Sequence, residues 1–186
     1  MKKLFLFILI GGSLAVRAQQ SEKILRYIET YKDLAIAEMQ RTGVPASVKL
    51  AQGIHETQAG TSVLVLKSNN HFGIKCKTGW TGETVSHDDD ARGECFRKYQ
   101  SAEASYRDHS DFLKNSKRYA SLFTLAPTDY TGWAEGLKKA GYATNPRYIQ
   151  ALVKLIEEYN LQQYTLQALN GPQQADSAGT DQNTEQ

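Results

Sequence analysis

A glutamate near the end of a short helical segment is the residue best suited to acid–base chemistry in this chain. Glu56 follows the apolar Ile54 by two positions, in a segment that begins at Pro45 and ends near Gly60. A carboxyl group that protonates a leaving oxygen atom must keep its proton near neutral pH, which an ordinary Glu does not do. Burial against apolar neighbours and the negative end of a helix dipole both raise the pKa of a carboxyl group. This context favours a general acid, and a solvated Glu at a helix end is the alternative.

The histidine that precedes this glutamate raises the question of a zinc enzyme. A zinc-binding helix needs a second His four residues after the first, and the residue four positions after His55 is Ala59. The two cysteines of the chain cannot form a zinc site alone. We therefore expect no metal ion and no cofactor.

Four motifs follow one another along the chain. They are Ala51-Gln52-Gly53-Ile54-His55-Glu56-Thr57, Asn69-Asn70-His71-Phe72-Gly73-Ile74-Lys75, Phe96-Arg97-Lys98-Tyr99 and Gly141-Tyr142-Ala143-Thr144-Asn145-Pro146-Arg147-Tyr148. In this order they resemble the glucosaminidase family (glycoside hydrolase family 73), which includes flagellar peptidoglycan hydrolases and many autolysins. The resemblance runs from about Tyr27 to Tyr159. Each motif alone would be weak, whereas the four in sequence are specific.

The resemblance implies a fold, an activity and a set of site residues. The fold is lysozyme-like, in the α+β class, mostly helical with a small β-hairpin lobe. The activity is cleavage of the β-1,4 bond between N-acetylglucosamine and N-acetylmuramic acid. Glu56 matches the catalytic acid of the family, and Tyr142 matches a tyrosine that supports catalysis. The residues assigned to substrate binding from the same motifs are Asn70, Phe72, Lys75 and Asn145.

The chain departs from the family pattern at the second carboxylate. Glycoside hydrolysis usually needs a partner that acts as a base on water or as a nucleophile, and the family often takes it from a Glu on the hairpin. No Glu stands at the matching place here. The candidates are Asp88, Asp89 and Asp90, with Glu83 and Glu94 nearby. The acidic run could instead be a solvated turn, and the 2-acetamido oxygen of the substrate could replace a protein carboxylate.

Aromatic and amide side chains near the motifs could complete a sugar groove. The aromatic residues that could stack on sugar rings are Phe72, Trp80, Tyr142 and Tyr148. Trp80 follows a glycine and has the best claim to exposure, whereas Tyr148 lies on an apolar helical stripe that is typical of a core. Asn69 and Asn70 could bond to the acetamido groups.

Helices are predicted on both sides of these motifs, because apolar residues recur there at steps of three and four. The expected segments are 24–39, 45–60, 102–112, 119–125, 130–140 and 145–159. In the last segment Asn145 is a favourable N-cap and Pro146 a favourable first helical residue. The second segment carries Glu56 close to its C-terminal end.

The stretch 67–99 differs in character and is rich in Gly, Asn, Asp and Thr. We expect a loop and then a small hairpin, with β-formers at 72–74 and 94–96 and a turn near 88–93. Cys76 and Cys95 flank this hairpin. In an oxidising compartment two cysteines indicate one disulfide, and two unpaired thiols are the alternative.

The N-terminus has the layout of a secretory signal peptide over residues 1–18. Lys2 and Lys3 precede an apolar run over residues 4–10, and small residues lead to Ala18, where cleavage is expected. The run is too short to span a bilayer, although an uncleaved anchor is the alternative. We expect an exported protein, periplasmic rather than extracellular, with no stable membrane insertion after cleavage.

The rest of the chain is expected to hold one domain over residues 19–164 and a polar, disordered tail over 165–186. Removal of the signal peptide lowers the 22 basic residues by three, so that they nearly match the 20 acidic ones. Such a balance gives no electrostatic footprint for nucleic acid. The expected partner is the glycan strand of peptidoglycan, bound by a monomer.

The function that these observations favour is that of an exported endo-beta-N-acetylglucosaminidase acting on peptidoglycan. A lytic transglycosylase or a muramidase on the same fold remains an alternative. A wall-binding module without activity is a second alternative, because the hairpin lacks the expected Glu.

Overall fold

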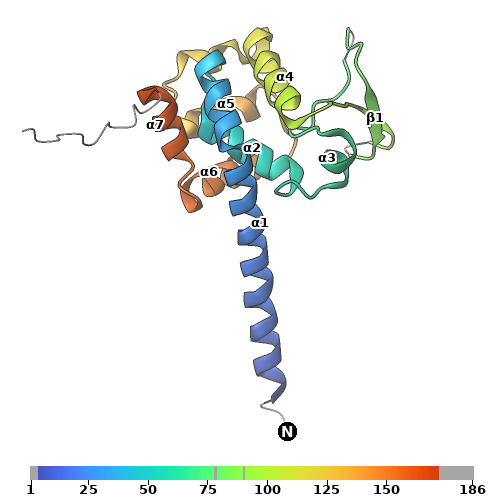
Figure 1. Cartoon of the computed structure of the whole chain (residues 1–186), viewed down its shortest axis with the longest axis vertical. Helices are drawn as coiled ribbons and strands as arrows, with labels where there is room; N and C mark the ends of the chain where they lie inside the picture. The colour runs from blue at the N-terminus through green and yellow to red at the C-terminus, as the bar shows by residue number, and fades with distance from the viewer. Residues whose placement is uncertain (1–3, 78, 90, 172–186) are drawn as a thin grey trace, which may run out of the picture.

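The computed structural model describes the backbone of residues 4–77, 79–89 and 91–171, and side chains from residue 17 onward. Its helices form one body with a small two-stranded lobe at one side (Figure 1). The elements are α1 (Leu4–Thr42), α2 (Ala46–Thr57), α3 (Val63–Ser68), β1 (Thr84–His87), β2 (Glu94–Arg97), α4 (Ala102–Asn115), the 3₁₀ helix η1 (Lys117–Thr124), α5 (Tyr130–Lys139), α6 (Tyr148–Glu158) and α7 (Gln162–Asn170). The predicted class, mostly helical α+β, is confirmed.

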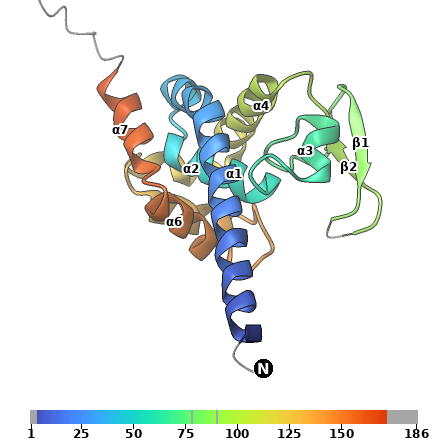
Figure 2. The same ribbon diagram turned by 60° about the horizontal axis from the view of Figure 1, so that its bottom comes forward.

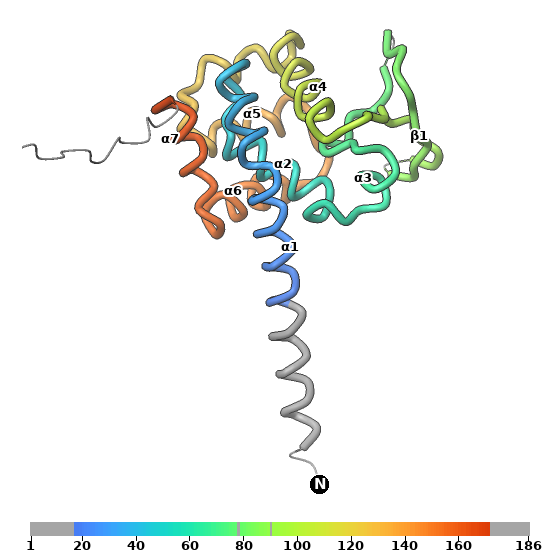
Figure 3. The backbone as a smooth tube through the Cα atoms, in the orientation of Figure 1, coloured from blue at the N-terminus to red at the C-terminus, as the bar shows by residue number. Residues whose placement is uncertain are grey.

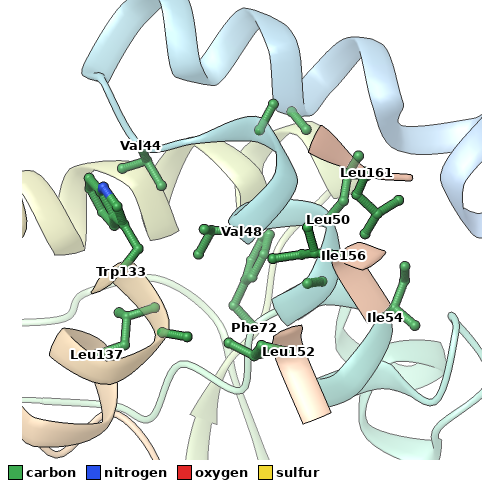
Figure 4. Packing of buried hydrophobic residues seen from close by; sticks show 14 of the residues in the cluster. Val44, Val48, Leu50, Ile54, Phe72, Trp133, Leu137, Leu152, Ile156 and Leu161 are labelled. Atoms are coloured by element: carbon green, nitrogen blue, oxygen red, sulfur yellow. The ribbon is translucent and has the colours of Figure 1, made fainter. Parts of the chain in front are cut away.

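Helix α2 is the centre of the helical body. Every residue of α2 except His55 and Glu56 is buried, as expected for a helix that other elements surround. Figure 4 shows its apolar side chains packed among those of α5 and α6. The labelled residues of this cluster include Val48, Leu50, Ile54, Trp133, Leu137, Leu152 and Ile156. The two exceptions stand at the C-terminal end, where α2 leaves the core.

Helix α1 packs closely on α2 because α2 has a glycine at the contact. A side chain at Gly53 would collide with the hydroxyl group of Tyr27 from α1. That hydroxyl lies 2.9 Å from Nδ1 of His71 and 3.1 Å from the hydroxyl of Tyr106 in α4. One buried polar group therefore connects α1, α4 and the loop after α3.

No helix in the described part of the chain has the length and apolar character needed to cross a bilayer. Residues 1–3 of the predicted signal peptide lie outside the description, and so do the side chains up to residue 16. The signal peptide remains a prediction.

The small lobe is an antiparallel pair of strands in which Val85 lies opposite Phe96 and Ser86 opposite Cys95. The sequence placed a β segment at 72–74, and this was wrong. Those residues form a loop, and only the next residue, Lys75, makes an isolated antiparallel bridge to Phe96 of β2. The strand that pairs with β2 is β1, which lies in the lobe at one side of the molecule (Figure 3). The cause is the side chain of Asn70, which bonds to both the N–H and the carbonyl oxygen of Ile74 and closes the loop into a turn.

The lobe is fastened at its base by a covalent bond and by an ion pair. The predicted disulfide between Cys76 and Cys95 is confirmed, with Cα atoms 5.3 Å apart. Arg97 of β2 donates hydrogen bonds of 2.8 and 2.7 Å to the carboxylate of Asp108 in α4. The hydroxyl of Tyr99 donates to the same carboxylate at 2.6 Å. The disulfide ties β2 to the segment before β1, and the contacts to Asp108 keep the lobe at a fixed position beside the helical body.

Helix α6 begins two residues later than predicted. The side chain of Asn145 accepts a hydrogen bond from the backbone N–H of Arg147 at 2.9 Å, so it caps a turn rather than the helix itself. Residues 146–147 form that turn, and α6 starts at Tyr148 with Arg147 as its N-cap. The fixed φ of Pro146 suits the turn as well as it would suit a helix.

The ordered chain extends further than the predicted boundary at residue 164. Helix α7 continues to Asn170 and packs on α1 and α2 (Figure 2). The hydroxyl of Thr165 accepts a 3.0 Å hydrogen bond from the backbone N–H of Ser47, in the first turn of α2. That N–H has no partner within its own helix, so α7 completes the start of the central helix. Residues 172–186 of the predicted tail lie outside the described residues.

Candidate active site

A groove of about 560 Å³ lies between the helical body and the small lobe. The end of α2, the loop 72–77 and the lobe form one part of its lining, and α4, η1 and the loop 141–145 form the other. His55 and Glu56, the two residues of α2 that are not buried, both line this groove. The central helix of the fold therefore delivers its only accessible side chains to one place.

Glu56 is held in its protonated form by its surroundings. Burial, the larger cause, and the charge of Asp89 in the lobe raise its pKa from 4.5 to about 8. At about pH 8, half of the Glu56 side chains are therefore still protonated. A protonated carboxyl group at the wall of an open groove is the arrangement of a general acid.

The loop that faces this carboxyl group is shaped by Asn70. Its side-chain amide donates to the carbonyl oxygens of Ile74 and Arg97, each at 2.9 Å, and its oxygen accepts from the N–H of Ile74 at 3.0 Å. Asn70 is 1% exposed. We therefore correct the expectation that Asn70 bonds to sugar, because its polar atoms are used within the protein.

Gly73 stands at the point of this loop nearest to Glu56. Its φ is +60°, and a Cβ atom there would lie 3.8 Å from Oε2 of Glu56. A side chain at this position would adopt a strained backbone and would fill the space beside the carboxyl group. The Gly in Phe-Gly-Ile-Lys thus keeps the approach to the acid open.

Tyr142 is bound to the same loop from the opposite wall. Its hydroxyl donates a hydrogen bond of 3.0 Å to the carbonyl oxygen of Phe72. Burial raises the pKa of Tyr142 well above its ordinary value, and the charge of Glu56 acts in the same direction. Tyr142 is therefore a neutral donor, and its ring lies 6.1 Å from that of Tyr148, in a stacked orientation.

A buried histidine and a buried lysine support the loop from below. The ring of His109 stacks on Phe72 at 3.9 Å between centroids, and its Nδ1 lies 3.0 Å from Nζ of Lys49. Nζ also donates to the carbonyl oxygen of Tyr106 at 2.9 Å. Burial lowers the pKa of Lys49 to about 7. Phe72 lines the groove but is only 1% exposed, so it serves mainly as a floor between this pair and the cleft.

The three hairpin aspartates separate in the structure. Asp88 accepts a 2.7 Å hydrogen bond from the N–H of Gly93 and stabilises the hairpin turn, away from the groove lining. Asp89 lines the groove. Asp90 lies outside the described residues. Among the described groove-lining residues, Glu56 and Asp89 are the two carboxylic acids.

Lys75 lines the groove as expected, and its charge is neutralised by carboxylates of the lobe. Its Nζ lies 2.9 and 3.0 Å from the carboxylate oxygens of Glu94 and 3.5 Å from that of Asp89. Glu94 is thus a partner of Lys75 rather than a groove-lining acid. Lys75 holds Asp89 near the entrance to the groove.

Of three further residues that were predicted to bind substrate, one lines the groove and two do not. Asn145 lines the groove. Asn69 does not, and its amide donates to the carbonyl oxygen of Tyr99 at 3.0 Å. Trp80 is also outside the lining, because its Nε1 donates to the backbone of Glu83 and the guanidinium group of Arg97 covers its ring at 4.5 Å. Asn69 and Trp80 therefore support the lobe.

Several groove-lining residues were not predicted. They are His55, Lys77, His87, Phe112, Arg118 and Tyr119, among others. Phe112 and Tyr119 fit the apolar stripes of their helices, so their types gave no functional signal. Lys77 and Arg118 resemble ordinary surface cations in sequence, and only the fold brings them to one groove.

A helical body, a two-stranded lobe and a protonated carboxyl group in the groove between them define a lysozyme-like glycoside hydrolase fold. A family model agrees with this class: residues 32–161 match Glucosaminidase, described as mannosyl-glycoprotein endo-beta-N-acetylglucosaminidase. The chain belongs to the glucosaminidase family.

Similar proteins are found by structure and by sequence. A crystal structure of a peptidoglycan hydrolase from Sphingomonas sp. A1 has a TM-score of 0.66 and 32% identity, over 84% of this chain and 99% of that chain. The peptidoglycan hydrolase FlgJ of Vibrio cholerae is 30% identical over 79% of this chain and 48% of its own length. The exo-glucosaminidase LytG of Bacillus subtilis is 30% identical over 74% and 52%. The chain thus spans about half the length of these curated relatives.

Proposed function

We propose that the protein cleaves peptidoglycan as an endo-beta-N-acetylglucosaminidase, at the β-1,4 bond between N-acetylglucosamine and N-acetylmuramic acid. The observation that carries this proposal is the position of Glu56, whose pKa is raised to about 8 at the wall of an open groove. Membership of the glucosaminidase family and the similarity to peptidoglycan hydrolases support the choice of substrate.

In this reaction Glu56 gives its proton to the glycosidic oxygen as the bond from that oxygen to the anomeric carbon breaks. Asp89 of the lobe is the proposed partner, which activates water or attacks the anomeric carbon itself. Its position supports this role, since it is the second acid among the described groove-lining residues. Attack by the substrate's own 2-acetamido oxygen is the competing course.

Tyr142 has a proposed role in orienting the substrate. Its neutral hydroxyl group lines the groove and is fixed by the hydrogen bond that it donates to Phe72. Because its single proton is used in that bond, the hydroxyl oxygen can accept a hydrogen bond from the acetamido N–H of the reacting sugar and orient that group. Asn145 and Lys75 line the same groove and are proposed to contact the glycan.

The compartment belongs to the same proposal. A substrate in the cell wall, a disulfide at the base of the lobe and the signal-like N-terminus agree with export. We place the protein in the periplasm, acting as a monomer.

The test is mass spectrometry of purified peptidoglycan after digestion, with borohydride reduction before the measurement. The proposal expects reduced N-acetylglucosamine at the new ends. Reduced muramic acid ends would make the protein a muramidase, and 1,6-anhydro ends would make it a lytic transglycosylase. Folded protein that gives no products on several wall types would favour a wall-binding module.

A further inference from the structure

One arm of the groove has a base of aromatic rings with a cation on each side. From the ring of Tyr142 the row continues to Tyr119 at 6.2 Å and then to Phe112 at 5.5 Å between centroids. Nζ of Lys77 lies 4.8 Å from the ring centroid of Phe112, and Cζ of Arg118 lies 5.7 Å from that of Tyr119. All five residues line the groove. The row therefore forms a continuous aromatic base, in which Tyr119 is buried and Phe112 and Tyr142 are half-buried.

The two cations come from different parts of the fold. Lys77 follows the disulfide-bonded Cys76 in the lobe, and Arg118 lies in η1, beside Gly141. Both side chains are exposed. The aromatic pair between them fixes where each charge stands, since a cation over a ring face is attracted by the ring.

These charges differ from the third cation of the groove. Lys75 is neutralised by Glu94 and Asp89. Within the described part of the chain, neither Lys77 nor Arg118 has a carboxylate partner. Sugar rings with hydroxyl and acetamido groups are neutral and need no such charges. The arm is thus suited to an anionic group next to a sugar-binding surface.

We propose that Lys77 and Arg118 form a subsite for a carboxylate of the wall polymer, carried beside a sugar that lies over the half-buried ring of Phe112. This inference rests on the proposed function, because it names a further determinant of the same substrate. A carboxylate in peptidoglycan has two sources. It belongs to the peptide stem, or it is the lactyl carboxylate of a muramic acid that has lost its stem. Both would bind to ammonium and guanidinium groups in the same way.

The test measures binding, so that it does not depend on turnover. The Glu56→Gln protein is used as the background, and its Kd is measured for three ligands by titration calorimetry. The ligands are stem-bearing glycan strands, strands whose stems were removed by an amidase, and neutral oligomers of N-acetylglucosamine. Lys77→Gln and Arg118→Gln are added singly and together. Lys114→Gln is the matched control, because Lys114 is exposed on α4 outside the groove lining.

We expect each single change to weaken binding of a carboxylate-bearing strand about 3-fold to 10-fold, with less than 2-fold change for the neutral oligomer and for the control. Lys77→Glu should weaken binding more than Lys77→Gln, because the charge is reversed. The effects should shrink in high salt, since exposed charges are screened. If the variants lose affinity for stem-bearing strands alone, the bound group is a carboxylate of the stem. If they lose affinity for the stemless strands, the bound group is the lactyl carboxylate.

The proposal of a carboxylate subsite would be overturned if the Lys77 and Arg118 variants lost as much affinity for the neutral oligomer as for the strands. It would also be overturned if these variants bound all three ligands with unchanged affinity, or if no ligand bound at all. Wild-type digestion of peptidoglycan is measured separately. Products from the wild type together with unchanged binding in the variants would leave the proposed function standing and remove only this inference.

Discussion

The hydroxyl group of Tyr142 donates a 3.0 Å hydrogen bond to the carbonyl oxygen of Phe72, one residue before the glycine that faces Glu56. This bond joins the loop before α6 to the loop before the lobe, at the floor of the groove. Two motifs that are 70 residues apart in the sequence therefore act as one structural unit. The position of the acid relative to its substrate depends on that unit.

Tyr142→Phe keeps the ring and removes this hydrogen bond. We expect kcat to fall at least about tenfold, since 1.4 kcal/mol of lost transition-state stabilisation corresponds to that factor. The free energy of unfolding should fall by only about 1 kcal/mol. Tyr130→Phe is the control, because Tyr130 is a half-buried residue outside the groove lining whose hydroxyl bonds to Glu157. Unchanged kcat in Tyr142→Phe would limit Tyr142 to packing.

Asp89→Asn separates the two proposed courses of hydrolysis. If Asp89 is the base or nucleophile, activity should fall by at least about 100-fold, whereas Asp88→Asn should have a small effect because Asp88 serves the turn. Loss of the Asp89 charge should also lower the pKa of Glu56, which that charge raises. The alkaline limb of the kcat/KM profile should then move to lower pH. Mild effects in both variants would favour attack by the substrate acetamide.

Glu56→Gln should make the fold more stable in a defined pH range. Glu56 binds its proton more tightly in the folded chain, with a pKa of about 8, than in the unfolded chain, with an ordinary value of 4.5. Its contribution to stability is therefore fully present below about pH 4.5 and is lost as the pH rises through about 8.

The variant should thus match the wild type at pH 4 and exceed it at pH 8 by about 1–2 kcal/mol, after allowance for solvent screening of a half-buried group. Urea unfolding at both pH values measures this difference. A constant difference between the two proteins across this pH range would contradict the raised pKa.

Reduction of the disulfide between Cys76 and Cys95 should loosen the small lobe. A cross-link that closes a loop of this size contributes about 3 kcal/mol, so a reducing agent should lower the melting temperature. Activity should fall too, because the lobe carries Asp89 and Lys75. The double variant Cys76→Ser, Cys95→Ser should show the lowered melting temperature and no response to the reducing agent. An equal response in the wild type and the variant would show that the disulfide is not the cause.

The sequence predicted the features that depend on periodicity and on the motifs. The helices, the disulfide and the presence of Glu56 and Tyr142 at one groove follow from apolar spacing and from the family resemblance. Helix α7 was missed because only Thr165 and Ala168 are buried, while its leucines Leu166 and Leu169 are exposed, so its sequence has no apolar stripe that matches the buried face. Its role in completing the start of α2 depends on a tertiary contact that no local pattern indicates.

The direction of individual side chains could not be predicted. Asn69 and Asn70 were both expected to bind substrate, but the side chain of each donates a hydrogen bond to the backbone of a neighbouring segment. Trp80 was expected to be open to substrate, and Arg97 covers its ring. Lys77 and Arg118 line one groove because that groove lies between the loop 72–77 and η1. Such contacts arise from the packing of distant elements and leave no pattern in the nearby sequence.

The most direct test of the central claim is the turnover of peptidoglycan by Glu56→Gln, compared with the wild type by mass spectrometry of the released products. The substitution removes the proton donor and little volume, so the variant should remain folded by circular dichroism. We expect turnover to fall by at least about 100-fold, as for the loss of a general acid. A folded variant that still releases the same products at the wild-type rate would contradict the assignment of Glu56 as the catalytic acid.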